Sequence, residues 1–383
     1  MTDAERISYT ANIFNLFRYA LTAILGRLTH RLRAIIPQTS NKLTYSEDNE
    51  ETNILLLLAV IYCTCDQSKS GCCLEHADVD FSNYPECDMK VSCIFENMNI
   101  LRNSTLQIDR DIHDFKCLIF RNSTVYEIPS GIFLTLKSNI THLYANHVGI
   151  AELRRISFPF GDKLRVVDLS GNKIKKIVET VFYDAPKLEI LNLSDNQISY
   201  FSSNAFEKLT SLKILNLSRN EITKIPYELF QPLNGIIFLN LRFNRLELKY
   251  GIFPDMVKSL DLSYNNIEFH HKFKIFALLN NLETLSLHGN RIENIHPSIF
   301  ESNLKFLGIS DNNFACNTLA DIFLAMREND VFMGLCATVT LSTCFYALFE
   351  RFSINDVADD FEIVKYDPIS RNFESVYDCL CIR

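Results

Sequence analysis

The phrase LEILNLSDNQI at residues 188–198 decides the fold, because close copies of it stand on both sides. LRVVDLSGNKI occupies 164–174 and LKILNLSRNEI occupies 212–222, so the phrase recurs with a spacing of 24 residues. Further copies start at Ile236, Val257, Leu282 and Leu304, and weaker ones start at Phe115 and Ile140. Repetition with a period of about 20–50 residues is the signature of a solenoid, in which every repeat forms one coil of a stack.

Each part of the phrase has a physical role in such a stack. Side chains alternate across a strand, so Leu191 and Leu193 are expected to point to one side, into the core. Neighbouring coils then pair their strands in parallel, since a single repeat cannot bury its leucines alone. The asparagine after each strand is expected to satisfy buried backbone groups at the turn. These asparagines are Asn172, Asn196, Asn220, Asn244, Asn265, Asn290 and Asn312.

Eight of the 29 phenylalanines form a second periodic column. Their regular place in each repeat predicts a stacked phenylalanine spine in the core rather than an aromatic ligand groove. The column consists of Phe133, Phe158, Phe182, Phe206, Phe230, Phe253, Phe276 and Phe300.

The twelve cysteines fall into two clusters with none between Cys117 and Cys316. A stack of coils is open at both ends, so the clusters are interpreted as disulfide-bonded caps. The candidate disulfide cysteines are Cys72, Cys73, Cys87, Cys93, Cys117, Cys316, Cys336 and Cys344. The C-terminal cluster holds an odd number, so Cys379 or Cys381 is expected either to remain a thiol or to bond another chain.

These observations divide the chain into five parts. Residues 1–65 form a leader with a basic amphipathic segment and a signal-like apolar core at 54–65. Residues 72–114 form the N-terminal cap, and 115–312 contain about nine repeats. Residues 313–349 form the C-terminal cap, and 350–383 form an acidic tail that is either ordered or disordered. The uncharged segment 331–349 is favoured as a buried cap helix and strand, with a membrane anchor as the alternative.

No catalytic constellation is present in the sequence. It contains no GxSxG, no HExxH and no glycine-rich phosphate loop, and no pair of CxxC units suggests a metal. The net charge of −8 argues against nucleic-acid binding. The chain is therefore predicted to be a binding protein rather than an enzyme, without cofactor or metal.

The pattern LxxLxLxxNxI resembles the leucine-rich-repeat family, and the longer repeats resemble its typical extracellular class. The flanks FKCLIFRNSTVYEIPSGIF (115–133) and SDNNFACNTLADIF (310–323) are similar to secreted, mosquito-type leucine-rich-repeat immune proteins. The resemblance implies an α/β-type horseshoe with a parallel sheet on the concave face. It also implies a secreted recognition or scaffold protein of innate immunity, a group that holds complement-like thioester proteins in disulfide-linked complexes. This chain lacks the long C-terminal coiled coil of that group, which argues against carrying over coiled-coil pairing and thioester-protein binding.

A protein ligand is expected on the concave face, where the side chains between the leucines are free. Aromatic residues and arginine dominate interface energetics, so the predicted contact residues are Phe238, Asn240, Arg242, Phe243 and Tyr264. A second candidate patch contains His142 and Tyr144. The candidate glycosylation sites are Asn103, Asn122, Asn139, Asn192 and Asn216. Sugar on Asn192 and Asn216 would occupy the middle of the concave face.

A second class of function stays open at this stage. Anchored through 331–349 or through the leader, the chain would be a cell-surface adhesion or receptor-like protein on the extracellular side of the plasma membrane. Without an anchor it would be secreted, with a disulfide-linked dimer or heteromer as one arrangement.

Overall fold

The computed structural model describes residues 82, 84, 86–88, 92–102, 115–129, 131–135, 139–155, 157–248, 252–268, 276, 278–301, 303–336 and 379–382. The chain divides into two compact units, 1–63 and 64–383, and all described residues belong to the second. The predicted leader, Cys72, Cys73, Asn103 and Cys344 lie outside the described residues.

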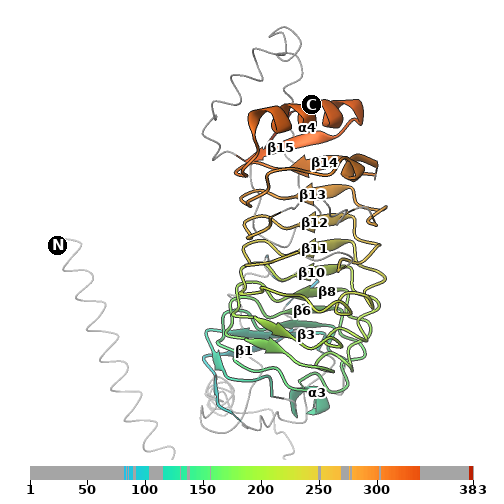
Figure 1. Cartoon of the computed structure of the whole chain (residues 1–383). Coiled ribbons are helices and arrows are strands. Elements are labelled where there is room, and N and C mark those ends of the chain that lie inside the picture. The colour runs from blue at the N-terminus through green and yellow to red at the C-terminus, as the bar shows by residue number, and fades with distance from the viewer. Residues whose placement is uncertain are drawn as a thin grey trace, which may run out of the picture. The chain divides into compact units, whose positions relative to one another are not determined.

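Twelve of the described strands form a single sheet, in which they are stacked in chain order (Figure 1). Neighbouring strands pair in parallel, except for the antiparallel last pair, β15 and β16. The strands are β1 (Ser92–Glu96), β3 (Cys117–Arg121), β5 (His142–Tyr144), β6 (Val166–Asp168), β8 (Ile190–Asn192), β10 (Ile214–Asn216), β11 (Phe238–Asn240), β12 (Ser259–Asp261), β13 (Thr284–Ser286), β14 (Phe306–Gly308), β15 (Phe332–Cys336) and β16 (Cys379–Ile382).

Every predicted repeat contributes one strand to this sheet, from β3 to β14, in the predicted register. Equivalent leucines lie opposite one another, for example Leu191 with Leu215 and Leu215 with Leu239. The parallel-sheet solenoid is confirmed, and it is consistent with the predicted horseshoe.

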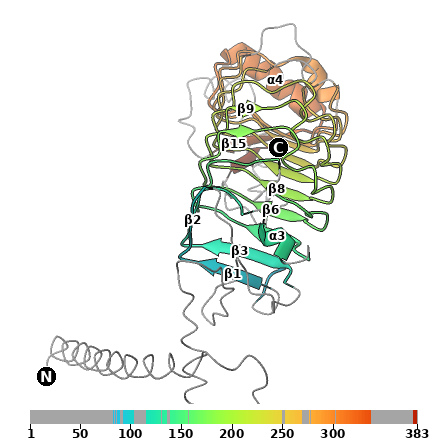
Figure 2. The same cartoon turned by 90° about the horizontal axis from the view of Figure 1, so that it is seen from below.

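The far side of the coils is built mainly of turns and short segments (Figure 2). Two small parallel pairs lie there, β2 (Asn99–Ile100) with β4 (Thr124–Val125) and β7 (Lys176–Ile177) with β9 (Tyr200–Phe201). The described helices are α3 (Gly131–Thr135), the 3₁₀ helix η3 (Pro297–Glu301) and α4 (Cys316–Glu328).

The phenylalanine spine is confirmed as part of the core. The rings of Phe158 and Phe182 lie 5.3 Å apart, those of Phe182 and Phe206 lie 6.1 Å apart, and those of Phe206 and Phe230 lie 6.4 Å apart. These spacings are within the range at which aromatic rings attract one another. The rings share one continuous buried cluster with the leucines that follow each strand, such as Leu193 and Leu217.

The repeated asparagines also point inwards, where each one joins adjacent coils. The side chain of Asn220 donates to the carbonyls of Leu193, Leu217 and Ser218 at 2.9, 3.1 and 3.1 Å. Its Oδ1 accepts from the Ile198 amide at 2.9 Å. Equivalent bonds surround Asn172, Asn196, Asn244, Asn265, Asn290 and Asn312.

The sheet begins one coil earlier than predicted. Residues Ser92–Glu96, which the sequence places inside the N-terminal cap, form β1 and pair residue by residue with β3. Cys93 and Phe95 in CIFEN take the places of the two inward-facing leucines of the phrase, which hid this coil from the pattern. The first two coils nevertheless share the pattern IF-x-N. Its asparagines, Asn97 and Asn122, have the same backbone conformation, with positive φ angles of 55° and 48°.

At the other end, α4 and β15 continue the stack after the last predicted repeat. Among the described residues, no helix is long and apolar enough to cross a membrane. The start of the uncharged segment 331–349 forms β15, and the interpretation of the whole segment as a cap stays a prediction. The predicted acidic tail ends in β16, so its last part is an ordered strand.

The described disulfide joins Cys87 to Cys117, and therefore ties the predicted N-terminal cap to the first predicted repeat. Cys93 and Cys316 are disulfide-bonded as well. The rest of the predicted cysteine framework, including bonds of Cys379 and Cys381 to another chain, stays a prediction.

Candidate functional site

The sheet has one face towards the core and one face away from it, which we call the strand face. In each central strand the middle residue is fully buried, whereas its two neighbours point to the strand face. The first column on this face contains Val166, Ile190, Ile214, Phe238, Ser259, Thr284 and Phe306. Within this column Val166, Ile190, Ile214 and Phe238 are partly exposed, whereas Ser259, Thr284 and Phe306 are buried.

The second column on the strand face serves the fold. The side-chain oxygen of Asn240 accepts a bond from the Arg242 amide at 3.0 Å, and Asp261 accepts from Ser263 at 2.9 Å. Asp168, Asn192 and Asn216 make the same bond two residues ahead. The predicted contact residue Asn240 thus uses its carboxamide oxygen to close the turn.

Two arginines and two aromatic rings gather where the chain leaves β10, β11 and β12. The rings of Phe243 and Tyr264 stack at 4.7 Å, with 17° between their planes. The Arg242 guanidinium carbon lies 4.7 Å from both ring centroids, and that of Arg219 lies 4.8 Å from Phe243. We call these four residues the Arg–aromatic cluster. The structure thereby brings three predicted contact residues together and adds Arg219, which the sequence analysis missed.

The backbone beneath the cluster is unusual for aromatic residues. The residue before each turn asparagine has a positive φ, which costs a residue with a Cβ about 1–2 kcal/mol. Gly171 and Gly289 avoid this cost in their coils. Phe243 and Tyr264 occupy the same position at φ 54°, where bulky residues are uncommon. Local backbone preference therefore does not explain why aromatic residues stand there.

The next coil makes room for the Tyr264 ring. A Cβ on Gly289 would collide with that ring, so the ring packs against bare backbone. His288, beside it, is buried, and burial followed by the charge of Arg242 lowers its pKa to about 4. Its Nδ1 accepts a bond from the Ser310 amide at 3.1 Å. His288 is therefore neutral near pH 7, and the positive charge in this region comes from the arginines.

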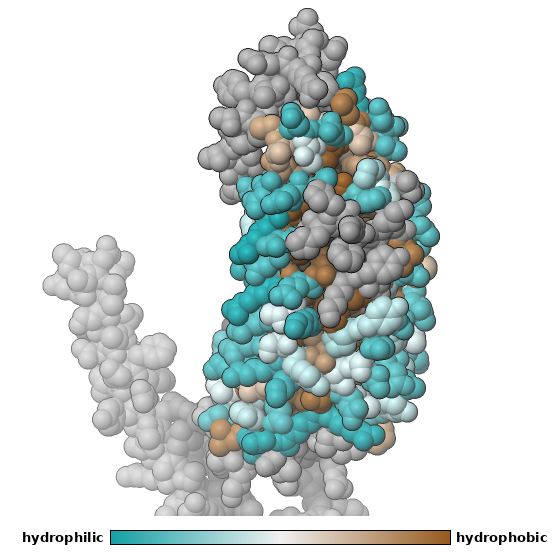
Figure 3. Space-filling model, in the orientation of Figure 1, coloured by the Kyte–Doolittle hydropathy of each residue, from teal (hydrophilic) through white to brown (hydrophobic). Residues whose placement is uncertain are grey.

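Charged residues line the edge at which the chain enters the strands. The Arg165 Nε donates to Glu189 at 2.8 Å and the Lys213 Nζ donates to the same carboxylate at 2.6 Å. These two hydrogen bonds lower the pKa of Glu189. The side drawn in Figure 3 is mainly hydrophilic, with hydrophobic residues in scattered patches. Exposed ion pairs contribute little stability, so this edge is interpreted as a solvated border.

The second predicted patch is not a contact surface. His142 and Tyr144 are only 4% and 5% exposed, so the expectation that they face a partner is wrong. Tyr84 packs edge-on against Tyr144 at 5.1 Å, and the Glu86 carboxylate lies 3.5 Å from the His142 Nε2. A loop before the repeats covers this end of the strand face. Its sequence carries no repeat phrase, and therefore gave no sign of where it packs.

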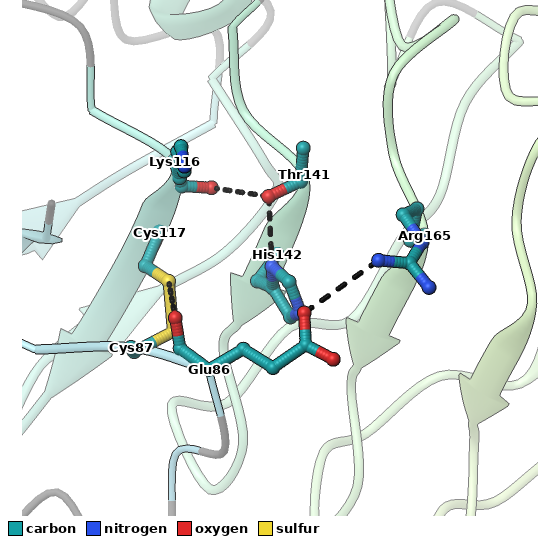
Figure 4. Close-up of a disulfide and its surroundings, with 7 residues drawn as sticks. All are labelled: Glu86, Cys87, Lys116, Cys117, Thr141, His142 and Arg165. Carbon is teal, nitrogen blue, oxygen red and sulfur yellow. Dashed lines mark hydrogen bonds and ion pairs between the residues drawn. A yellow bond between two sulfur atoms is a disulfide. The ribbon is translucent and has the colours of Figure 1, made fainter.

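The disulfide holds this loop in place (Figure 4). Cys117 on β3 bonds Cys87, and the Cys117 sulfur lies 4.0 Å from the Glu86 carbonyl. The Glu86 carboxylate also contacts Arg165 at 3.6 Å. Burial lowers the pKa of His142, although the charge of Glu86 raises it. The loop is therefore fixed by one covalent bond, by the ion pair between Glu86 and Arg165, and by the contact of Glu86 with His142.

We expect the sequons to divide by exposure when the chain is expressed in a secreting eukaryotic cell. Asn122 is exposed and Asn139 is half-buried, whereas Asn192 and Asn216 are only 4% and 7% exposed. Either buried amide could carry a glycan only if its side chain left the packed sheet. Glycopeptide mass spectrometry is expected to find sugar on Asn122 and Asn139 and none on Asn192 and Asn216. Sugar on the latter pair in folded protein would contradict this placement.

Models of known families match the repeats. The family model "Leucine rich repeat" matches residues 138–198, 162–214 and 186–246, and a second leucine-rich-repeat model matches 281–302. No curated protein matches the sequence.

Two solved structures show similar folds. A leucine-rich-repeat protein of Leptospira interrogans is 19% identical with a TM-score of 0.47, and the match covers 62% of this chain and 66% of that one. An octameric complex of Latrophilin 3, Unc5D and the leucine-rich repeats of FLRT2 gives 20% identity and a TM-score of 0.48, covering 62% and 80%. The family matches and the geometry of the coils together identify residues 138–246 and 281–302 as leucine-rich repeats.

Proposed function

We propose that this chain is an extracellular recognition or scaffold protein that binds another protein through its strand face. The Arg–aromatic cluster, together with Phe238, forms the centre of the contact. The absence of catalytic motifs from the sequence is consistent with a role in binding.

One observation carries the proposal, namely that Phe243 and Tyr264 stack in two successive coils at a backbone position better suited to glycine. Residues held in costly backbone conformations concentrate at functional sites. Both rings are partly exposed and Arg219 is exposed, whereas Arg242 is buried, so the accessible part of the cluster is the two rings and Arg219. Tyrosine and arginine are also enriched among the residues that contribute most to protein interfaces.

The extracellular location is supported by the cysteine chemistry. Cys87, Cys93, Cys117 and Cys316 are all disulfide-bonded, and such bonds persist in oxidising compartments. The role in innate immunity rests on the resemblance of the flanks, and it remains a prediction. Secretion without an anchor is the favoured form.

The double variant Phe243→Gly, Tyr264→Gly tests the proposal. Removing two central contact side chains, each contributing about 2 kcal/mol, is expected to weaken partner binding by roughly a thousandfold. Glycine adopts a positive φ angle without the steric cost that the two aromatic residues bear, and this gain offsets the lost ring stacking. The free energy of unfolding is therefore expected to change by no more than about 1–2 kcal/mol. The measurement is quantitative mass spectrometry of proteins retained from extracellular fluid by immobilised wild type and variant.

Tyr227→Ala provides the matched control, because it removes an exposed ring outside the strand face. It is expected to retain the same proteins as the wild type. Equal retention of every protein by the double glycine variant would refute binding through the cluster.

A further inference from the structure

We infer that Cys87, Cys117, His142 and Glu86 bind one zinc ion when the Cys87–Cys117 disulfide is reduced. This inference does not depend on the proposed partner-binding function. The sequence gave no sign of the site, because its residues come from three separate segments without a CxxC pair.

The ligand atoms are already close together. The two sulfurs and a ring nitrogen of His142 all lie within 4.8 Å of one another. Tetrahedral zinc, with bonds of about 2.0–2.3 Å, holds its ligand atoms about 3.3–3.8 Å apart. The sulfurs must therefore separate after reduction, while the histidine needs only a small approach.

Half of the site is fixed by the sheet. Cys117 and His142 lie directly opposite each other in the register of β3 and β5, and both are buried. Cys87 and Glu86 come from the loop that lies over them (Figure 4). A rigid pair on the strands and an adjustable pair on a loop allow the sulfurs to move apart without disturbing the stack.

The fourth ligand is the Glu86 carboxylate, which lies 3.5 Å from the His142 Nε2. This carboxylate also contacts Arg165 at 3.6 Å. Because the arginine competes with zinc for it, the carboxylate is expected to be the weakest of the four ligands. Two thiolates, an imidazole and a carboxylate form a set that suits zinc and not calcium or magnesium.

The surroundings of His142 also suit a metal ligand. Its Nδ1 lies 2.8 Å from the Thr141 hydroxyl, which itself donates to the Lys116 carbonyl at 3.3 Å. The Thr141 oxygen can thus accept a bond from the Nδ1–H, which leaves Nε2, the nitrogen that faces the Glu86 carboxylate, to bind the metal between them. Metal-binding histidines are commonly oriented by such a bond from their other nitrogen.

The chemistry balances with a dithiol as the reductant. The dithiol transfers two electrons and two protons to the disulfide, which yields two cysteine thiols and the cyclic disulfide of the reductant. Zinc binding then releases the two thiol protons, and the metal keeps its oxidation state.

Site-resolved alkylation of the full chain tests the inference. The protein is reduced with dithiothreitol, transferred to dithiol-free, oxygen-free buffer, and treated with iodoacetamide with or without one equivalent of zinc. Mass spectrometry then reports the labelling of each cysteine separately. Zinc is expected to slow the alkylation of Cys87 and Cys117 at least tenfold in the wild type.

His142→Gln is expected to abolish this protection, and Glu86→Gln to weaken zinc affinity severalfold. Glu86 is exposed on the loop, so its variant tests the site without disturbing the core. His147→Ala removes an exposed histidine just after β5 and is expected to retain full protection. Equal alkylation of Cys87 and Cys117 with and without zinc would overturn the inference, as would full protection in His142→Gln.

Discussion

Replacing Asn220 with alanine is expected to lower the free energy of unfolding by about 3 kcal/mol or more, because it leaves several buried backbone groups without a partner. The Asn220 side chain bonds the Leu193 carbonyl and the Ile198 amide of the preceding coil and the Leu217 carbonyl of its own coil, so it joins two successive coils. No water replaces these bonds in a packed interior without opening the stack. Urea unfolding followed by circular dichroism measures the change.

Glu221→Ala is the control for this substitution, since the neighbouring side chain is exposed. It is expected to change the free energy of unfolding by no more than about 0.5 kcal/mol. If the two variants lose the same stability, the asparagines do not hold the coils together.

Replacing Phe206 with alanine is expected to cost about 3–5 kcal/mol of unfolding free energy, the usual range for removing a buried phenylalanine. The Phe206 ring is fully buried and contacts Phe182, Phe201 and Phe230 at centroid distances of 6.1, 5.9 and 6.4 Å. The cavity therefore opens inside the spine and removes support from the coils on both sides. Thermal and urea unfolding of the purified protein measure the loss.

Two further variants show whether the loss comes from the spine. Phe206→Leu retains much of the volume and is expected to cost less than about 2 kcal/mol. Tyr183→Ala, which removes an exposed ring next to Phe182 in sequence, is expected to change the free energy by no more than about 0.5 kcal/mol. A loss in Phe206→Ala below about 1 kcal/mol would show that the rings do not form the core.

The parts of the fold that could be predicted are those that repeat. Leucine, asparagine and phenylalanine recur because each coil packs against similar neighbours. The role of a residue in one repeat therefore applies to the equivalent residues of the other repeats. The outward columns followed from the alternation of side chains along a strand. The Arg–aromatic cluster was found only in part, because Arg219 enters it through a contact between coils rather than through the strand pattern.

The parts that could not be predicted are the segments in which the repeat pattern of the sequence stops. The first coil uses Cys93 and Phe95 in place of the leucines, so β1 was assigned to the cap. The loop around Glu86 has no repeat partner, and nothing in its sequence shows that it covers His142 and Tyr144. Contacts between a unique segment and a repetitive one depend on the folded geometry, which pattern analysis does not supply.

Amide-resolved hydrogen exchange tests the stacking of the coils most directly. The amides of Ile174, Ile198 and Ile222 each donate to an asparagine of the following coil at 2.9–3.0 Å, although none of them lies in a strand. Stacked coils predict slow exchange at all three amides, and Asn220→Ala is expected to accelerate exchange at Ile198 most strongly. Exchange at these amides as fast as in an exposed loop would contradict the stack on which every functional proposal depends.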